Sequence, residues 1–404
     1  MINDLDSLIN SMVGELGQEL INFRRDLHAH PELGFAEHRT TDRIIARLTA
    51  AGLRPRRLQT GTGVLCDIVP DDADGRPMVE TPMIGLRGDI DALPIQDGKD
   101  VSYRSTNAGV CHACGHDVHT TVVLGTGLVL ARLRDRGLLT KPVRLIFQPA
   151  EEASPGGAPG TIDAGALEGV DEVYAFHCDP RTEVGRIALR VGPITSASDR
   201  VLVRVTGGGG HTSRPHLTSD LVTALGQIAV SAPLLLSRRV DPRGGSSLVW
   251  GRIHSGTAAN AIPSVGELEG TVRSTRTEGW RAAQEMLPDL IRQIAAPYGA
   301  HVEVTVTPGV PPTVNHASGV RRLTEAATGI LGGDAVGLTE QSLGGEDFAW
   351  MLDKVPGAMA RLGVNNPEHS EAVDIHQPRF DPDERAIAIG VRVFSRLCAV
   401  PGGG

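Results

Sequence analysis

Aromatic residues are scarce in this 404-residue sequence, because Phe, Trp and Tyr together make up only 3% of it. A folded core must therefore rest on Val, Leu, Ile and Ala, and the 40% of hydrophobic residues is ordinary for a folded protein. Cysteine is also scarce: five residues, an odd number scattered along the chain, do not form a disulfide framework. We expect the cysteines to serve metal or thiol chemistry instead.

The sequence also lacks an excess of positive charge and a long apolar run. Its formal net charge of -9 offers no general attraction for nucleic acid or anionic lipid. No window holds the roughly 18 or more apolar residues that a bilayer span requires. Asp4, Asp6 and Glu15 interrupt the N-terminal segment, which is the wrong pattern for a signal peptide. We therefore expect a cytoplasmic protein with no nucleic-acid partner and no membrane partner.

The length exceeds the usual size of a single hydrophobic core and predicts two or more domains. In the first half of the chain, short apolar runs alternate with segments of helical spacing. This alternation predicts an α/β layer with a largely parallel sheet. The expected strands are 64–69, 83–86, 143–147 and 173–176, and the expected helices include 40–51 and 117–133.

From about residue 199 the order changes to β-α-β-β-α-β, which is typical of a ferredoxin-like α+β domain. Its expected strands are 201–205, 247–253, 267–272 and 301–307, and its expected helices are 219–236 and 278–296. The alternating pattern then resumes, with helices near 319–331 and 383–398 around a short strand at 359–362. We interpret the chain as one α/β domain, residues 1–196 and 308–404, interrupted by an inserted domain at 197–307.

The segment CHACGHD, from Cys111 to Asp117, places two thiols, two imidazoles and a carboxylate just ahead of a predicted helix. A haem attachment site would need a histidine directly after the second cysteine, where Gly115 stands. The spacing of Cys111 and Cys114 permits a redox dithiol. Sulfur and imidazole together are typical of a zinc-like metal site, which is the interpretation that we favour. Taken alone, the segment leaves both interpretations open, beside a chance cluster.

Carboxylates and a further histidine follow the ends of the predicted strands. Asp89 and Asp91 come after the second strand, Glu151 and Glu152 after the third, and His177 after the fourth. Because the carboxyl ends of parallel strands line one edge of a sheet, we expect these side chains to meet there. One member of a carboxylate pair can bind metal while the other moves protons. The two aspartates are candidate partners for ligand imidazoles.

Nine features then occur in order along nearly the whole chain. They are RRDLHAHPELGF, RGDIDALP, HACGHDVHT, QPAEE, the strand-end histidine, GGGGHTSRPH, GTAANAIP, GGEDF and IHQPRF. This combination resembles the aminoacylase, hippurate hydrolase and auxin-conjugate amidohydrolase branch of peptidase family M20. The resemblance implies a di-metal exopeptidase-like catalytic domain with a mostly parallel sheet. It also implies that the inserted ferredoxin-like domain helps to bind substrate and to form a homodimer or higher homo-oligomer.

The resemblance assigns roles to individual residues as well. The implied metal ligands are Cys114, His116, Glu152, His177 and His376. They would hold two divalent ions bridged by the cysteine thiolate, with zinc or manganese expected first and cobalt or nickel as alternatives. Glu151 would be the general base, and His211 would donate to the tetrahedral oxyanion. Asn260 and Arg273 would hold the substrate carboxylate.

The predicted function is hydrolysis of the amide bond of N-acyl or N-aroyl amino acids, or of similar small amides, by metal-activated water. One alternative is a dipeptidase or aminopeptidase of the same superfamily, which requires a free amine on the substrate. Another is a non-catalytic metal or thiol sensor using Cys111 and Cys114, although a sensor has no need of a general base such as Glu151. Cys111 and Cys178 are departures from the family pattern, to which the sequence assigns no role.

Overall fold

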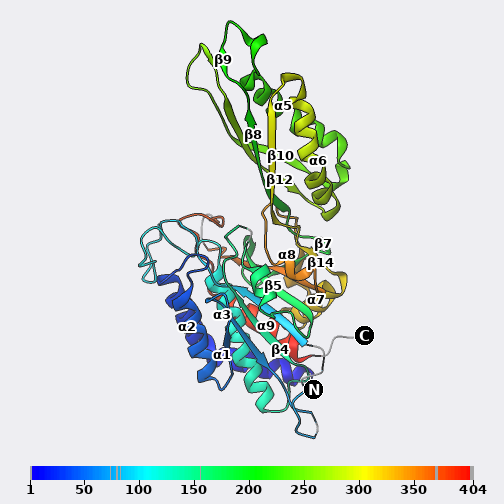
Figure 1. The fold of residues 1–404 in the computed structure, drawn as a ribbon. Coiled ribbons are helices and arrows are strands. Elements are labelled where there is room, and N and C mark those ends of the chain that lie inside the picture. Colours follow the sequence, from blue (N-terminus) through cyan, green and yellow to red (C-terminus); the bar gives the residue numbers. More distant parts are fainter. Residues whose placement is uncertain are drawn as a thin grey trace. The chain divides into compact units, whose positions relative to one another are not determined.

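The computed structural model describes residues 2–72, 74–78, 81, 83–154, 156–368 and 372–400 (Figure 1). The chain forms two compact units. Unit 1 comprises Met1–Ile194, Val314–Glu340 and Trp350–Gly404, and unit 2 comprises Thr195–Thr313 and Gln341–Ala349. The expected boundaries near residues 196 and 308 lie within a few residues of the ends of Thr195–Thr313. The segment Gln341–Ala349 had no counterpart among the expected boundaries.

Unit 1 is built on one large sheet. Its strands are β1 (Arg56–Arg57), β2 (Val64–Ile68), β3 (Met83–Asp89), β4 (Val143–Gln148), β5 (Val170–Glu183), β6 (Ile187–Leu189), β15 (Val336–Leu338) and β16 (Gly357–Asn365). Their order is β1-β2-β4-β3-β5-β16-β6-β15. The central strands β4, β3, β5 and β16 are parallel to one another, whereas β2 and β6 pair antiparallel with β4 and β16. The predicted mostly parallel sheet is confirmed.

Two predicted strand ends beside the candidate site were misplaced. The strand expected at 83–86 continues as β3 to Asp89, which is therefore its last residue and does not follow it. The apolar run stops at Phe176, which indicated a strand ending before His177, but β5 continues to Glu183. Its polar second half pairs in parallel with β16, so the backbone hydrogen bonds extend beyond the apolar residues. His177 therefore lies inside a strand and not after one.

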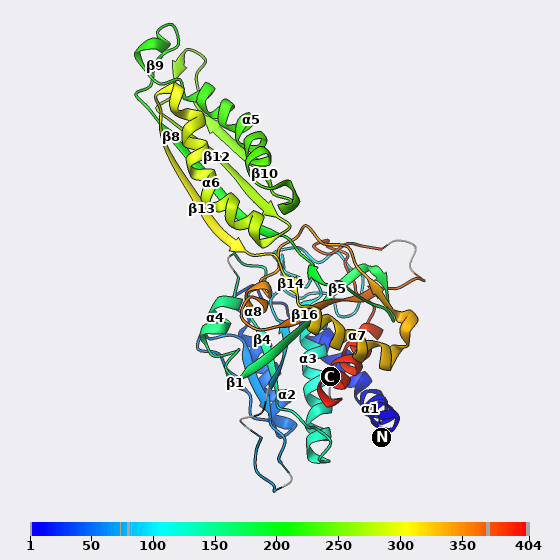
Figure 2. The same cartoon turned by 90° about the vertical axis from the view of Figure 1, so that its right-hand side faces the viewer.

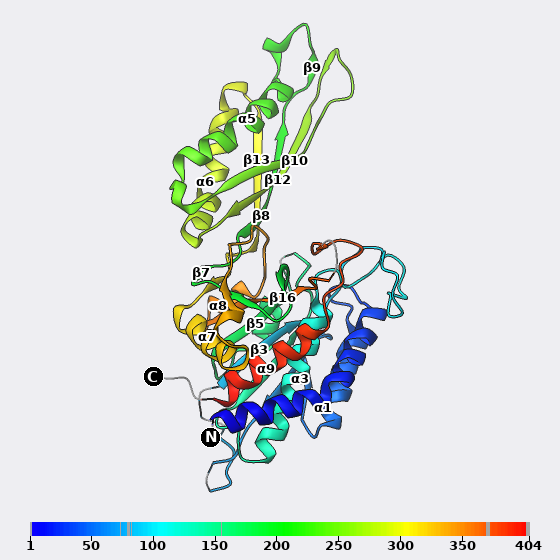
Figure 3. The same cartoon turned by 180° about the vertical axis from the view of Figure 1, so that it is seen from behind.

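Buried helices cover this sheet. The helices of unit 1 are α1 (Ile2–Ala29), α2 (His38–Ala50), α3 (His116–Asp135), α4 (Ala158–Asp163), α7 (Ala317–Leu331) and α9 (Arg385–Ala399), and the short α8 (Ala349–Leu352) lies at the boundary. The helix α3 packs against both α1 and α9 (Figure 3). Almost all of its residues are buried, as is every residue of β3 and β4. The first turn of α3 is therefore held on all sides.

Unit 2 has the predicted β-α-β-β-α-β order. Its main elements are β8 (Ala197–Thr206), α5 (Leu221–Arg239), β10 (Ser247–Ser255), β12 (Val265–Ser274), α6 (Thr277–Ala295) and β13 (His301–Val310). The four strands form an antiparallel sheet in the order β10-β12-β8-β13. Both helices cover one face of this sheet (Figure 2). The alternating buried residues Val201, Val203 and Val205 of β8 face the helices and join their core.

Among the described helices, only α5 is long and apolar enough to cross a membrane by length and composition. Its buried residues, which include Leu225, Ile228 and Leu236, belong to the core of unit 2. This helix also packs against β10 and α6. One face of this helix is therefore buried in the core of unit 2, whereas Val222, Val230 and Leu234 on the same helix are exposed.

Two short ribbons were not predicted, because pairs of two-residue strands have no periodicity to detect. In unit 2, β9 (Gly210–His211) pairs antiparallel with β11 (Ala261–Ile262). In unit 1, β7 (Gly192–Pro193) pairs antiparallel with β14 (Val314–Asn315). The second ribbon joins the last residues before the insertion to the first residues after it.

Gly357 illustrates how closely the strands of unit 1 pack. A Cβ at this position would lie 1.7 Å from the carbonyl oxygen of Val173 on β5. We expect Gly357→Ala to lower the free energy of unfolding by at least about 1–3 kcal/mol, the usual cost of overpacking. Gly14→Ala is the matched control, since position 14 is exposed on α1 with nothing within 4 Å of the added Cβ. It should stabilise the protein by roughly 0.5–1 kcal/mol. Equal effects of the two changes in urea unfolding would contradict this account.

Candidate metal centre

The turn that begins α3 brings Cys114 and His116 to the same place. Gly115 stands between them with a φ of 93°, in the left-handed region that favours glycine. A Cβ on Gly115 would lie 2.7 Å from the Sγ atom of Cys178. Conformation and space therefore both require glycine between the two expected ligands. Both ligand side chains are buried.

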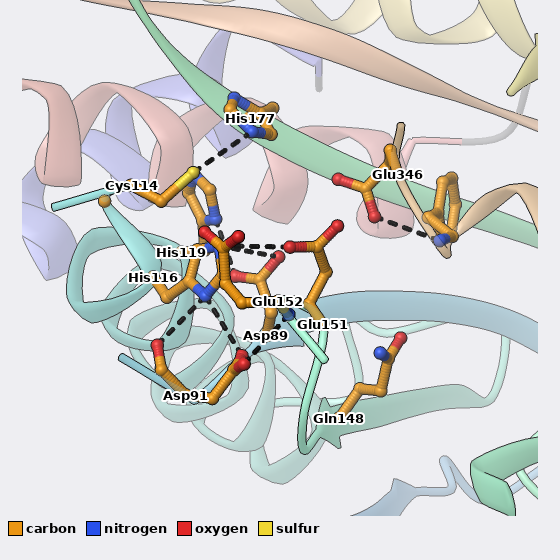
Figure 4. Close-up of polar contacts among 12 residues, drawn as sticks. Asp89, Asp91, Cys114, His116, His119, Gln148, Glu151, Glu152, His177 and Glu346 are labelled. Carbon is orange, nitrogen blue, oxygen red and sulfur yellow. Dashed lines mark hydrogen bonds and ion pairs between the residues drawn. The ribbon is translucent and has the colours of Figure 1, made fainter. Parts of the chain in front are cut away.

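Asp91 positions His116 and Glu152 at once (Figure 4). The Nδ1 atom of His116 donates toward the carbonyl oxygen and Oδ1 of Asp91, at 3.0 and 3.1 Å. The Oδ2 atom of Asp91 accepts the backbone N–H of Glu152 at 2.9 Å. The other nitrogen of the ring, Nε2, then faces carboxylate oxygens of Asp89, Glu151 and Glu152 at 3.7, 3.8 and 3.9 Å. The predicted role of Asp91 as partner of a ligand imidazole matches this geometry.

His177 faces Cys114 from within β5 (Figure 4). Its Nδ1 donates to the carbonyl oxygen of Cys178 at 2.8 Å, so the lone pair is on Nε2, which lies 3.6 Å from the Sγ atom of Cys114. Burial, and then the charge of Arg361 on the neighbouring strand, hold the pKa of His177 well below its usual range. The ring is therefore neutral, which metal ligation requires.

His376 reaches Glu152 from the loop that precedes α9. Its Nε2 lies 3.1 Å from Oε1 of Glu152, without the alignment of a hydrogen bond. Ligand atoms of Cys114, Glu152 and His376 all lie within 4.8 Å of one another, and so do those of His116, Glu151 and Glu152. The two groups share Glu152, and His177 adjoins them through its 3.6 Å contact with Cys114, so the five expected ligands and the expected base lie together.

This cluster fits divalent cations. Two buried ligand atoms, Nε2 of His116 and Oε1 of Glu152, have no hydrogen-bond partner among the described residues. Burial raises the pKa of the Cys114 thiol well above its usual range, so its thiolate form needs a nearby cation. Burial lowers the pKa of His116, but the charge of Asp89 together with the interactions with Cys114 and Asp91 outweighs burial and raises that pKa well above its usual range. The surroundings therefore favour positive charge, and sulfur, imidazole and carboxylate donors suit zinc and its neighbours.

Asp89 and His119 support the cluster without belonging to it. The Oδ1 atom of Asp89 accepts from Nδ1 of His119 at 2.7 Å, and the Nε2 of His119 accepts the backbone N–H of Cys178 at 2.8 Å. Both nitrogens of this ring are thus occupied, so His119 links α3 to β5 and does not bind metal. Burial alone raises the pKa of Asp89, but the charge of Arg87 and then of His116 hold it well below its usual range.

A buried ion-pair network beneath the turn was not predicted. Arg24 of α1 is fully buried, and its Nε donates to Oδ2 of Asp117 at 2.7 Å. The same oxygen accepts from Nδ1 of His28 at 2.6 Å. Arg24 also lies 3.4 Å from carboxylate oxygens of Asp381 and Glu384. Burial raises the pKa of Asp117, but the charges of Arg24 and then His28 hold it well below its usual range. Since Asp117 directly follows an expected ligand, the network fixes the start of α3.

Strained backbone flanks the cluster. Ala150, which precedes Glu151, has a φ of 56°, and His376 has a φ of 61°. Such values are uncommon for residues other than glycine and persist only where the surroundings impose them. The backbone N–H of Ala150 donates to Oε1 of Glu37, and its carbonyl oxygen accepts from the N–H of Gly157, both at 2.8 Å. These bonds hold the turn that separates the two neighbouring glutamates.

His211, Asn260 and Arg273 all lie in unit 2. His211 belongs to β9, which pairs with β11, and β11 begins directly after Asn260. Those two residues are therefore neighbours. Arg273 stands near the far end of β12, roughly 25 Å along the strand from its first residue, and its Nη1 donates to the carbonyl oxygen of Leu343 at 3.0 Å. Within this unit, the structure brings His211 and Asn260 together but places Arg273 away from them.

Comparison with known proteins decides the family. The pattern of peptidase family M20/M25/M40 matches residues 85–399. The chain belongs to this family. As a family member it is a hydrolase, and the fold and family that the nine features indicated are confirmed.

Two relatives and one solved structure illustrate the likeness. The chain is 37% identical to the N-acetylcysteine deacetylase of Bacillus subtilis (strain 168), over 94% of this chain and 96% of that protein. It is 45% identical, over 94% of its length, to a Rhodococcus jostii (strain RHA1) protein named putative glutamate--cysteine ligase 2-3. The chain spans only 46% of the length of that relative. A crystal structure of a Bacillus subtilis dinuclear metal-binding peptidase of family M20 matches with a TM-score of 0.81 at 34% identity, covering 96% of this chain and 98% of that one.

The buried pair of Arg24 and Asp117 generates a stability prediction for this family member. We expect Arg24→Met to lower the free energy of unfolding by about 3–5 kcal/mol, because it removes the arginine partner of the buried Asp117 carboxylate and leaves His28 as its remaining side-chain partner. Arg25→Met is the control on the same helix: Arg25 is 40% exposed and pairs with Glu384 at 2.7 Å. Its loss should cost less than about 1 kcal/mol. Urea unfolding measures both variants.

The difference in the free energy of unfolding between wild type and Arg24→Met should depend on pH, because the pKa of Asp117 is lowered in the folded protein. A carboxyl whose pKa is lower in the folded protein stabilises the fold above its unfolded pKa, about 3.9. That stability is lost as the pH falls through the folded pKa. The gap between wild type and Arg24→Met should thus be full at neutral pH and shrink below about pH 4. A gap that widens on acidification would rule out the pairing.

Proposed function

We propose that the protein is a metal-dependent amidohydrolase that cleaves the amide bond of N-acyl or N-aroyl amino acids, or of similar small amides. The observation that carries this proposal is the cluster of Cys114, His116, Glu151, Glu152 and His376, in which a carboxylate that is not an expected ligand adjoins the expected ligands. Family membership supports hydrolysis, and the relative named N-acetylcysteine deacetylase supports an N-acyl amino acid as substrate.

Two divalent ions are the proposed cofactors, as in the dinuclear peptidase of the same family. Cys114, His116, Glu152, His177 and His376 would hold them, with zinc or manganese expected first. When bound, such ions act as Lewis acids that polarise a carbonyl group and make water more acidic. Neighbouring groups of the chain orient two of the ligand rings. Asp91 orients His116 through Nδ1, and the backbone carbonyl oxygen of Cys178 orients His177 in the same way.

Glu151 is the proposed general base. Its Oε2 lies 3.8 Å from Nε2 of His116, so the carboxylate is close to the expected ligands (Figure 4). The strained turn at Ala150 lets Glu151 and Glu152 take different directions. The carboxylate of Glu151 would take a proton from the attacking water and return it to the nitrogen of the leaving amine.

His211 stays the predicted donor to the oxyanion, and its local geometry supports this role. Its Nδ1 accepts the backbone N–H of Ser213 at 3.1 Å and lies 2.8 Å from the Ser213 hydroxyl. The neutral ring therefore carries its proton on Nε2, which leaves an N–H to donate. Asn260 and Arg273 stay predictions as substrate-binding residues, and the homodimer stays a prediction as well.

The thiol-sensor alternative has little support. Burial raises the pKa of Cys111 to about 11, whereas a reactive thiol has a lowered pKa. The dipeptidase alternative differs only in the group on the substrate nitrogen. It is separated from the proposal by the substrate panel below, which compares a free amine with an acylated one.

Metal removal and a substrate panel test the proposed reaction. We expect a chelator to abolish hydrolysis, and zinc, manganese, cobalt or nickel added singly to restore it to different extents. N-acetylcysteine and N-acetylmethionine should be hydrolysed, while alanylmethionine, which has a free amine, should be a poor substrate. Amine release measures each rate. Preference for the dipeptide would replace the proposal by the peptidase alternative, and activity without metal would refute it.

Glu151→Gln tests the proposed mechanism. The amide keeps the size of the side chain but cannot accept the proton, so kcat should fall by about 10²–10⁴-fold. The number of bound ions, measured by mass spectrometry of metals, should stay that of the wild type. Glu152→Gln is the matched change one residue later, and it should lose both metal and activity. Full turnover by Glu151→Gln, or loss of its metal, would remove Glu151 from the role of base.

A further inference from the structure

Phe35 combines a strained backbone with a side chain that is about half exposed. It is the third residue other than glycine with a positive φ in the described part of the chain, at 63°, together with Ala150 and His376. This conformation is a real outlier for a bulky residue. The ring is nevertheless 53% exposed, so it contributes little to the core. A costly backbone that presents an aromatic ring to solvent indicates a functional position.

The loop that carries Phe35 packs directly against the turn of the proposed base. A Cβ on Gly34 would lie 3.1 Å from Cβ of Ala150 and 3.5 Å from Oδ2 of Asp91. The next residue, Phe35, is therefore held beside the segment that holds Glu151. The close approach also explains why residue 34 has no side chain.

Hydrogen bonds on both sides make this loop rigid. The backbone N–H of Ala92 donates to the carbonyl oxygen of Glu32 at 2.8 Å, and Leu33 forms a parallel bridge with Ala92. The carboxylate of Glu32 accepts the backbone N–H groups at the start of α2, at 2.9 and 2.8 Å. Glu37 binds the N–H of Ala150. The loop of Phe35 is therefore tied to Ala92 and to Ala150, the residue that precedes Glu151.

Charge indicates which half of the substrate meets this loop. The ionisable groups that tie it down are the carboxylates of Glu32 and Glu37, and the carboxylate of Asp91 lies next to Gly34. Arg39, at the start of α2, is paired with Asp26 at 2.7 Å. Such surroundings repel the carboxylate of an N-acyl amino acid, so they suit its uncharged acyl half. Leu33, 39% exposed, adds a second apolar side chain here.

We propose that Phe35 is a specificity-determining residue that contacts the apolar part of the acyl group, so that extended or aromatic acyl groups bind more tightly than acetyl. This inference rests on the proposed function, because it presupposes an N-acyl substrate. It concerns the apolar contact alone, and the chemistry of the metal cluster does not depend on it.

The test compares N-acetyl, N-hexanoyl and N-benzoyl derivatives of one amino acid, methionine, on the metal-loaded enzyme. Phe35→Ala should raise KM for the hexanoyl and benzoyl substrates about tenfold or more, and change KM for the acetyl substrate less than about twofold, with kcat retained for all three. Phe35→Leu, which keeps an apolar side chain, should recover most of the loss for hexanoyl. Leu138→Ala is the control, because Leu138 is an exposed apolar residue, 40% exposed, near the far end of α3.

A second measurement separates binding from turnover. Isothermal titration of the same three compounds into Glu151→Gln, and into Glu151→Gln combined with Phe35→Ala, gives the affinities without appreciable hydrolysis. Phe35→Gly removes both the ring and the backbone strain, so it should be at least as stable as Phe35→Ala. If both variants lose affinity for the hexanoyl and benzoyl compounds, lowered stability is not the cause.

The outcomes are distinct. Loss of the preference for long and aromatic acyl groups in Phe35→Ala, with intact hydrolysis of the acetyl compound, supports the proposal. An equal change for all three acyl groups, or none, overturns it while leaving the proposed function intact. If the wild type neither binds nor hydrolyses any of the three, the proposed function fails and this inference fails with it.

Discussion

The carboxylate of Asp91 holds the ring of His116 with one oxygen and the backbone of Glu152 with the other. These two expected ligands come from different elements, the first turn of α3 and the loop after β4. A shared acceptor at the end of β3 sets their separation, so the spacing of the cluster depends on this one side chain. The loop of Leu33 lies against the same segment through its bridge with Ala92. The edge of the sheet, the start of α3 and the loop before α2 thus form one connected frame.

Three carboxylates in and beside the cluster differ in the positive charge that the chain places next to them. Asp89 and Asp117 each have an arginine of the chain as partner, Arg87 and Arg24 respectively, and their pKa values are held well below the usual range. Glu152 instead has its buried Oε1 beside His376 and the thiol of Cys114, with no hydrogen-bond partner for that atom among the described residues. The chain therefore supplies arginine partners for Asp89 and Asp117, whereas the buried oxygen of Glu152 is left to receive a cation. A bound divalent cation would compensate the negative charge of these donors.

Much of this arrangement could be predicted from the sequence. Buried parallel strands are recognisable as apolar runs, and polar residues just after them meet at one edge, which located Asp89, Asp91, Glu151 and Glu152. The network of Arg24 was missed because a charged residue inside an amphipathic helix is normally assigned to the exposed face. Its spacing of four residues from His28 placed both on one side of the helix, which was the available signal.

Other features could not be predicted from the pattern of residues at all. The extension of β5 beyond Phe176 depends on pairing with β16, a contact between segments nearly two hundred residues apart. The positive φ of Phe35 and Ala150 is imposed by tertiary contacts and leaves no mark in composition or periodicity. Residues 341–349 group with unit 2 for a similar reason, since Leu343 and Gln341 bind backbone and side chains of that unit.

The ribbon of β7 and β14 has an evolutionary consequence. Because the residues before and after Thr195–Thr313 pair with each other, the two attachment points of the insertion lie about one strand spacing apart. To the larger unit, the inserted domain is equivalent to the tip of a hairpin loop. The entropy of closing such a loop grows only slowly with its length. During evolution, inserted segments of very different length could therefore replace one another at this point, while the residues of the cluster keep their positions in the larger unit.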